Sequence, residues 1–155
     1  MSKKNKQEAG ATDASGAPVD AAALVTKHLR IGWWMVLIYL SMGIALEAMH
    51  GLKIGWYLNV ANETRRLMFT LAHSHGVLIG VLHLAYAFSA KTLPEAPSKL
   101  SSMCLTASGV LLPGGFLLGG IVVYGGDPGK GILLVPVGAA FLLIAVLQTA
   151  LKTRG

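Results

Sequence analysis

The chain has 155 residues, of which 54% are hydrophobic and only 13% are charged, and its mean hydropathy is +0.60. Soluble domains carry about 25% charged residues, so this composition argues against an ordinary soluble protein. The net charge of +6 does not indicate nucleic-acid binding, because the lysines and arginines flank apolar segments instead of forming a basic stripe. The single cysteine, Cys104, excludes an intramolecular disulfide, and no Cys/His zinc pattern is present.

The N-terminal segment, residues 1–28, is predicted to be a disordered cytoplasmic tail. It is polar, rich in Ala, Gly and Ser, and poor in aromatic residues, so it cannot bury enough apolar surface to fold alone. Lys27, His28 and Arg30 are expected to flank the first helix.

Four apolar runs follow, at about 31–50, 67–89, 100–124 and 132–151. Each is close to the ~17–25 residues that a helix needs to cross a bilayer. The sequence therefore predicts an all-α fold, an integral membrane four-helix bundle that occupies residues 29–155 in contact with the lipid bilayer.

The orientation of this bundle follows from the basic residues. Nine lysines and arginines lie in the two termini and the second loop, and four lie in the first and third loops. Because basic residues favour the cytoplasmic side, both termini are predicted to be cytoplasmic. In a bacterium the membrane would be the plasma (inner) membrane.

The second apolar run carries His73, His75 and His83, three of the five histidines in the chain. Ionisable side chains at membrane depth are costly and are candidates for a functional site. On a helical wheel His73 shares a face with Gly76 and Gly80, whereas His75 points to the other side.

Two glycine pairs have the spacing that lets membrane helices approach closely, namely Gly76 with Gly80 and Gly115 with Gly119. They predict either tight packing within the bundle or association into a homo-oligomer or a larger membrane complex.

The candidate site is a Glu/His cluster near the outer leaflet, between the first two helices. Glu47 and His50 are neighbours on one helix face, and His73 and His75 lie at similar depths if the helices are antiparallel. Such residues suit Fe, Zn or Cu, or haem. Secondary candidates are His83, about 15 Å further along the helix, and Arg65.

Three interpretations of this cluster stay open. Glu47 could form a buried pair with His73 or Arg65 that locks the two helices together; the cluster could hold a metal or haem; or it could form a pocket that handles protons or a substrate. No nucleophile motif is present. The leading hypothesis is a binding or assembly subunit, and the alternative is a metal- or haem-binding redox protein or enzyme.

Several short motifs resemble a family of small four-helix membrane proteins, the transmembrane-protein-256-like proteins. They are Met-His-Gly-Leu-Lys around His50, an early histidine in the second helix, a glycine-rich third helix, and Val-Pro-Val-Gly around Pro136. The resemblance covers residues 35–151. The His-x-His pair at His73 and His75 and the N-terminal extension depart from the family pattern. That family has no established activity, so the resemblance implies the four-helix topology only.

Overall fold

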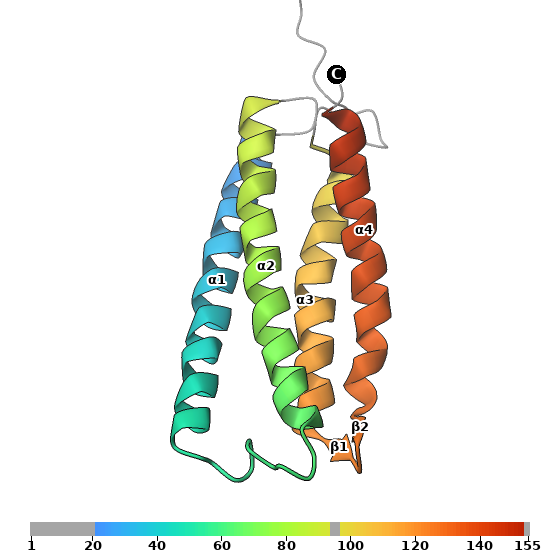
Figure 1. Cartoon of the computed structure of the whole chain (residues 1–155). Helices are drawn as coiled ribbons and strands as arrows, with labels where there is room; N and C mark the ends of the chain where they lie inside the picture. Colours follow the sequence, from blue (N-terminus) through green and yellow to red (C-terminus); the bar gives the residue numbers. More distant parts are fainter. Residues whose placement is uncertain (1–20, 94–96, 154–155) are drawn as a thin grey trace, which may run out of the picture.

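The computed structural model describes residues 21–93 and 97–153, which form a bundle of four long helices joined in up-and-down order (Figure 1). The helices are α1 (Ala21–Gly51), α2 (Thr64–Thr92), α3 (Lys99–Ile121) and α4 (Leu134–Lys152). Two short strands, β1 (Val123–Tyr124) and β2 (Asp127–Pro128), pair as a hairpin after α3, and a 3-10 turn, η1 (Lys130–Leu133), leads into α4. The predicted four long helices are confirmed.

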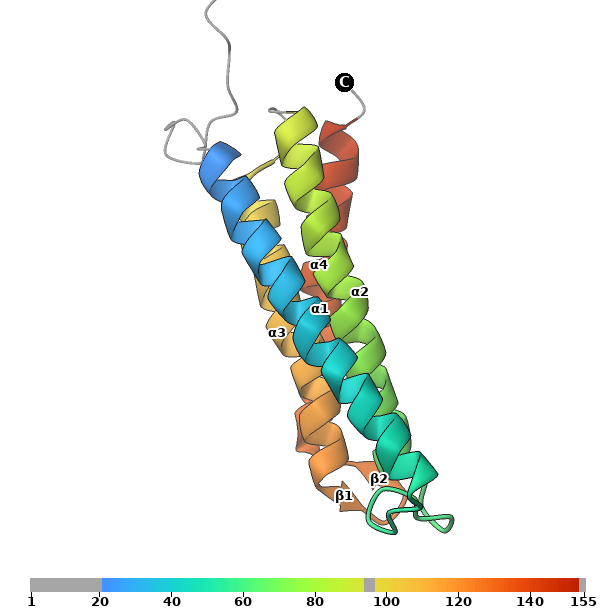
Figure 2. The ribbon, with the colours of Figure 1, turned by 90° about the vertical axis from the view of Figure 1, so that its left-hand side faces the viewer.

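The bundle has two distinct ends. The start of α1, the end of α2, the start of α3 and the end of α4 lie at one end, which we call the termini end (Figures 1 and 2). The α1–α2 loop and the β1–β2 hairpin lie at the opposite end, which we call the loop end.

Neighbouring helices pack in chain order, α1 on α2, α2 on α3 and α3 on α4. The two central helices, α2 and α3, therefore supply most of the buried residues, among them Ile79, Leu105 and Leu112. A second apolar cluster, at the loop end, joins Leu46, Tyr57 and Phe69. The Ser98 side chain caps the start of α3 and forms a reciprocal capping box with Ser101, which satisfies backbone donors at that helix end.

The outer helices expose large apolar side chains. Ile44 of α1 is 66% exposed and Leu143 of α4 is 68% exposed. Within the described residues, four helices are long and apolar enough to cross a membrane. These features are those of a multi-pass membrane protein, in which lipid rather than water covers such surfaces.

Several helix boundaries differ from the prediction; for example, α2 (Thr64–Thr92) is three residues longer at each end than the predicted 67–89. The first helix begins at Ala21, ten residues before the predicted start, so residues 21–28 are helical rather than part of a disordered tail; residues 1–20 of that tail lie outside the described residues. The third helix ends at Ile121 rather than at 124, because the chain turns into the β1–β2 hairpin. This turn uses Gly125 at a positive φ of 60°, which glycine adopts without strain.

Candidate functional site

A cavity of about 380 Å³ opens at the loop-end half of the bundle between α1 and α2. We call it the loop-end pocket. Its polar lining residues are Glu47 of α1, Thr70 and His73 of α2, and Tyr57 of the connecting loop; its apolar and glycine lining residues are Leu40, Gly43, Ile44 and Leu46. Two of the four predicted primary site residues, Glu47 and His73, thus border one cavity.

His73 is held in place by α1. Its Nδ1 atom lies 2.6 Å from the Tyr39 carbonyl oxygen. A carbonyl can only accept, so Nδ1 carries the hydrogen and donates it, and Nε2 of the neutral ring is an acceptor. The ring lies across Gly43, where a Cβ atom would overlap it. Nε2 makes no hydrogen bond within the described part of the chain, so it is available to a ligand.

A side chain of α1 makes the corresponding contact with a glycine of α2. The Tyr39 ring lies across Gly76 of α2, which leaves no room for a Cβ atom there, and Gly80 approaches the Gly32 backbone of α1. On the other side of the bundle, Gly115 meets Gly131 and Val135 near the start of α4. The structure thus places these glycines at contacts between helices of one chain.

Glu47 forms no direct bond with any of its predicted partners. The Glu47 side chain is exposed and makes no hydrogen bond or ion pair with any described residue. Arg65 makes its contacts elsewhere: it donates to the Trp56 and Gly120 carbonyls, 2.9 and 3.1 Å away, and lies over the Trp56 ring. The expectation of a direct Glu47 pair with His73, His75 or Arg65 is therefore wrong, and the carboxylate stays available.

The remaining histidines of the predicted cluster are separated from the pocket. His50 is exposed near the end of α1. His75 donates to the Leu71 carbonyl of its own helix (2.8 Å) and packs against Phe116 of α3, with ring centroids 4.9 Å apart. Across residues 21–93 and 97–153, no three His, Cys, Asp or Glu side chains come close enough to hold a metal ion. The structure does not assemble the predicted metal or haem ligand set.

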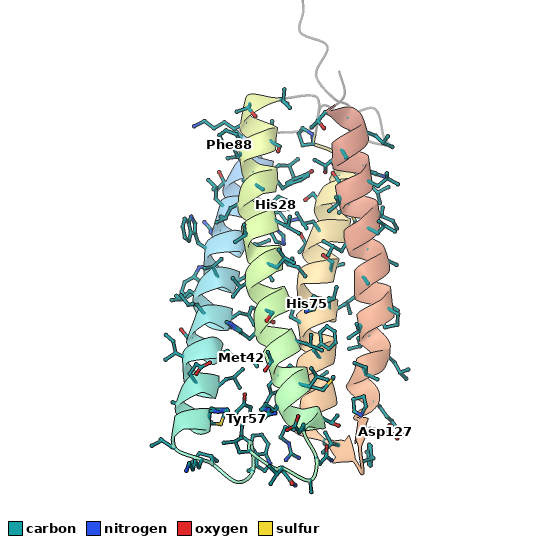
Figure 3. All side chains as sticks on the ribbon, in the orientation of Figure 1. His28, Met42, Tyr57, His75, Phe88 and Asp127 are labelled. Atoms are coloured by element: carbon teal, nitrogen blue, oxygen red, sulfur yellow. The ribbon has the colours of Figure 1, made fainter. Side chains whose placement is uncertain are left out.

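A second polar cluster forms around His28, which lies toward the termini end (Figure 3). His28 of α1 and His83 of α2 are both fully buried, and their Nδ1 atoms are 2.6 Å apart. Their ring centroids are 4.8 Å apart, so the two rings meet at their Nδ1 edges. His28 Nε2 is also 2.8 Å from the Ser102 hydroxyl of α3, so one hydrogen-bonded unit joins three helices.

This cluster continues into α3 through Tyr86. The Tyr86 ring lies 4.5 Å from the His28 ring, and its hydroxyl is 2.8 Å from the Ser101 hydroxyl and 3.1 Å from the Ser98 carbonyl. Ser98 in turn bonds to Gln148 of α4 (3.1 Å). The polar contacts at this end therefore reach all four helices.

The spacing of the α1 residues could have revealed His28. Counting back from Gly43 in steps of three or four residues gives Tyr39, Val36, Gly32 and His28, all on the face that meets α2. Because the helix was expected to start at 31, His28 was placed outside it. His83 was recognised only as a secondary candidate, and nothing in the sequence places it opposite His28.

Comparisons with known proteins add no relative: no protein family, curated protein or solved structure matches this chain. Its function must therefore be inferred from the chemistry of its own residues.

Proposed function

We propose that this chain is a multi-pass membrane protein that binds an amphiphilic molecule with a hydrogen-bond-donating, cationic headgroup in the loop-end pocket. The headgroup contacts Glu47 and His73, and the apolar part lies along the outer surface of α1. Both termini are cytoplasmic in this proposal, so the pocket lies toward the outer leaflet. The four-helix topology is also what the resemblance to transmembrane-protein-256-like proteins implies.

The observation that carries this proposal is the unpartnered carboxylate of Glu47 beside the acceptor nitrogen of His73. A carboxylate near the apolar part of a bilayer costs free energy unless a cation or hydrogen-bond donor accompanies it. None of the described residues forms an ion pair or a hydrogen bond with this carboxylate, although Thr70 and Tyr57 line the same pocket. A ligand with an ammonium group would supply both a charge and several N–H donors.

The depth of the pocket fits an amphiphile. Glu47 lies four residues before the end of α1 at Gly51, which is about 6 Å along the helix axis. This depth is close to the lipid headgroups. The pocket is also bordered by Leu40 and Ile44, which are 50% and 66% exposed on the outer side of α1. An alkyl chain attached to the headgroup would meet these side chains.

The test is the affinity of the purified protein, in neutral detergent, for a long-chain primary amine, measured by isothermal titration calorimetry. An alcohol of the same chain length is the uncharged comparison. We expect saturable binding of the amine and weaker binding of the alcohol. Glu47→Gln should weaken amine binding by about 10-fold, which corresponds to ~1.4 kcal/mol. It should leave the melting temperature unchanged, because Glu47 has no partner within the described residues.

The matched control is Glu63→Gln, the same chemical change at a glutamate that pairs with Arg66 (2.7 Å) outside the loop-end pocket. This variant should bind the amine like the unmodified protein. Equal affinities of the Glu47→Gln and Glu63→Gln variants would refute the proposal, as would amine and alcohol binding with the same affinity.

A further inference from the structure

The His28–His83 pair lies at the other end of the bundle and has no part in the proposed ligand pocket. Both rings have no exposed surface, and the pair connects α1 to α2 while Ser102 connects it to α3. A distance of 2.6 Å between two nitrogen atoms is that of a short hydrogen bond. It is too short for two ligands of one metal ion, because Zn–N bonds of 2.0–2.1 Å in a tetrahedral site separate the nitrogens by about 3.3 Å.

The neighbouring groups favour one direction of hydrogen bonding through the cluster. The Lys27 ammonium group can only donate, and it donates to the Ser102 hydroxyl oxygen (3.1 Å). This leaves the Ser102 hydroxyl hydrogen free to point at His28 Nε2. The hydrogen of His28 is then on Nδ1, which donates to His83 Nδ1. The hydrogen of His83 is then on Nε2, and the His83 ring also interacts with the Leu105 backbone of α3.

Only one hydrogen atom fits between the Nδ1 atoms of His28 and His83 at this distance. If a proton were added to His83 Nδ1, two N–H groups would face each other at 2.6 Å and the His83 cation would lie close to the Lys27 ammonium group. The other groups facing the rings do not compensate this charge. They are Tyr86 of α2 and, from α3, the uncharged Ser102 hydroxyl and the Leu105 backbone, and no carboxylate of the described residues hydrogen-bonds to either ring.

We propose that the His28–His83 pair is a proton-sensitive lock. With one hydrogen between the two Nδ1 atoms, the pair holds α1 and α2 against α3 at the termini end. Binding of a proton to the other Nδ1 atom separates the rings, and α1 then loses its contacts with the other two helices. The opened form binds more protons than the closed form. Acidification therefore favours opening, and stability is lost as the pH falls.

The test compares thermal unfolding of the full chain in neutral detergent at about pH 8 and about pH 5, the range in which histidines commonly titrate. The unmodified protein should lose at least ~4 °C of melting temperature on acidification. His83→Asn should lose less than ~1 °C, because the amide oxygen can occupy the place of Nδ1 and accept from His28, but cannot be protonated. His75→Asn, which changes a histidine outside the pair, should keep the full loss.

A measurement on the unmodified protein makes the test independent of whether the variant folds. Nitrogen NMR of histidine-labelled protein at about pH 8 should show one protonated and one unprotonated Nδ1 joined by a shared hydrogen. On acidification, the Nδ1 signals of His28 and His83 should change over the same pH range in which α1 loses its contacts with α2 and α3. Two protonated Nδ1 atoms in a fully folded bundle would overturn the proposal, as would an equal pH effect in His83→Asn and the unmodified protein.

Discussion

Tyr86 is the residue that links the buried histidine pair to the start of α3. Its hydroxyl bonds to the Ser101 hydroxyl and the Ser98 carbonyl and accepts from the Ser98 backbone N–H, while its ring contacts His28. Only 5% of its surface is exposed. Removing a hydroxyl group buried to this degree leaves several hydrogen-bond partners unsatisfied, so the whole set of bonds contributes to the stability of the folded protein.

Tyr86→Phe should therefore lower the free energy of unfolding by about 1–3 kcal/mol while the bundle stays intact. Tyr124→Phe is the matched control: Tyr124 is 58% exposed in the hairpin, so its loss should have little effect. Denaturant unfolding monitored by circular dichroism measures both values. A loss of equal size in the two variants would mean that the Tyr86 hydroxyl adds no stability.

At the scale of single residues, local contacts can be predicted from a sequence more easily than distant ones. Glu63 and Arg66, for example, form an ion pair at i,i+3 spacing. Helical spacing fixes such neighbours without knowledge of the fold. The contact of His28 with His83 joins residues 55 positions apart, so it depends on the register of α1 against α2, which no local pattern determines.

At the scale of helices, contacts between α1 and α2 depend on glycines that receive aromatic rings. The Tyr39 ring occupies the space above Gly76, and the His73 ring occupies the space above Gly43. The small-residue spacing indicated that Gly76 and Gly80 would meet another helix. It could not show whether that helix belongs to the same chain, because the spacing permits close approach without specifying the partner.

Gly76→Ala tests this interlocking of helices. The added methyl group would overlap the Tyr39 ring, so we expect a loss of about 1–3 kcal/mol despite the better helix propensity of alanine. Gly114→Ala is the control, because no atom lies within 4 Å of a Cβ atom at Gly114. The melting temperatures of the two variants in detergent provide the comparison. An equally stable Gly76→Ala variant would show that α1 and α2 are not closely packed at this point.

For the whole molecule, the long apolar runs predicted the number and order of the helices, because a helix that crosses a bilayer must be apolar over most of its length. The ends of the helices were harder to predict. Polar residues such as Lys27 and His28 resemble a flanking segment in the sequence, yet they continue α1 and contact α3. The hairpin at the loop end is too short to produce a periodic signal of its own.

The positions of the helix ends and the distribution of basic residues support one membrane topology. The start of α1 and the end of α4 share the termini end, and the β1–β2 hairpin lies at the loop end (Figure 1). In the sequence, nine lysines and arginines fall in the two termini and the second loop, and four fall in the first and third loops. We therefore expect Thr153 on the cytoplasmic side and Asp127 on the outer side, together with the proposed ligand pocket.

The most direct test of a four-span bundle with an outward-facing pocket is cysteine labelling in intact cells. Asp127→Cys and Thr153→Cys are introduced separately into a Cys104→Ser background, since Cys104 is the only native cysteine. A membrane-impermeant maleimide should label position 127 in intact cells and position 153 only after permeabilisation. Labelling of both positions in intact cells, or of position 127 only after permeabilisation, would contradict the proposed topology and the outward location of the pocket.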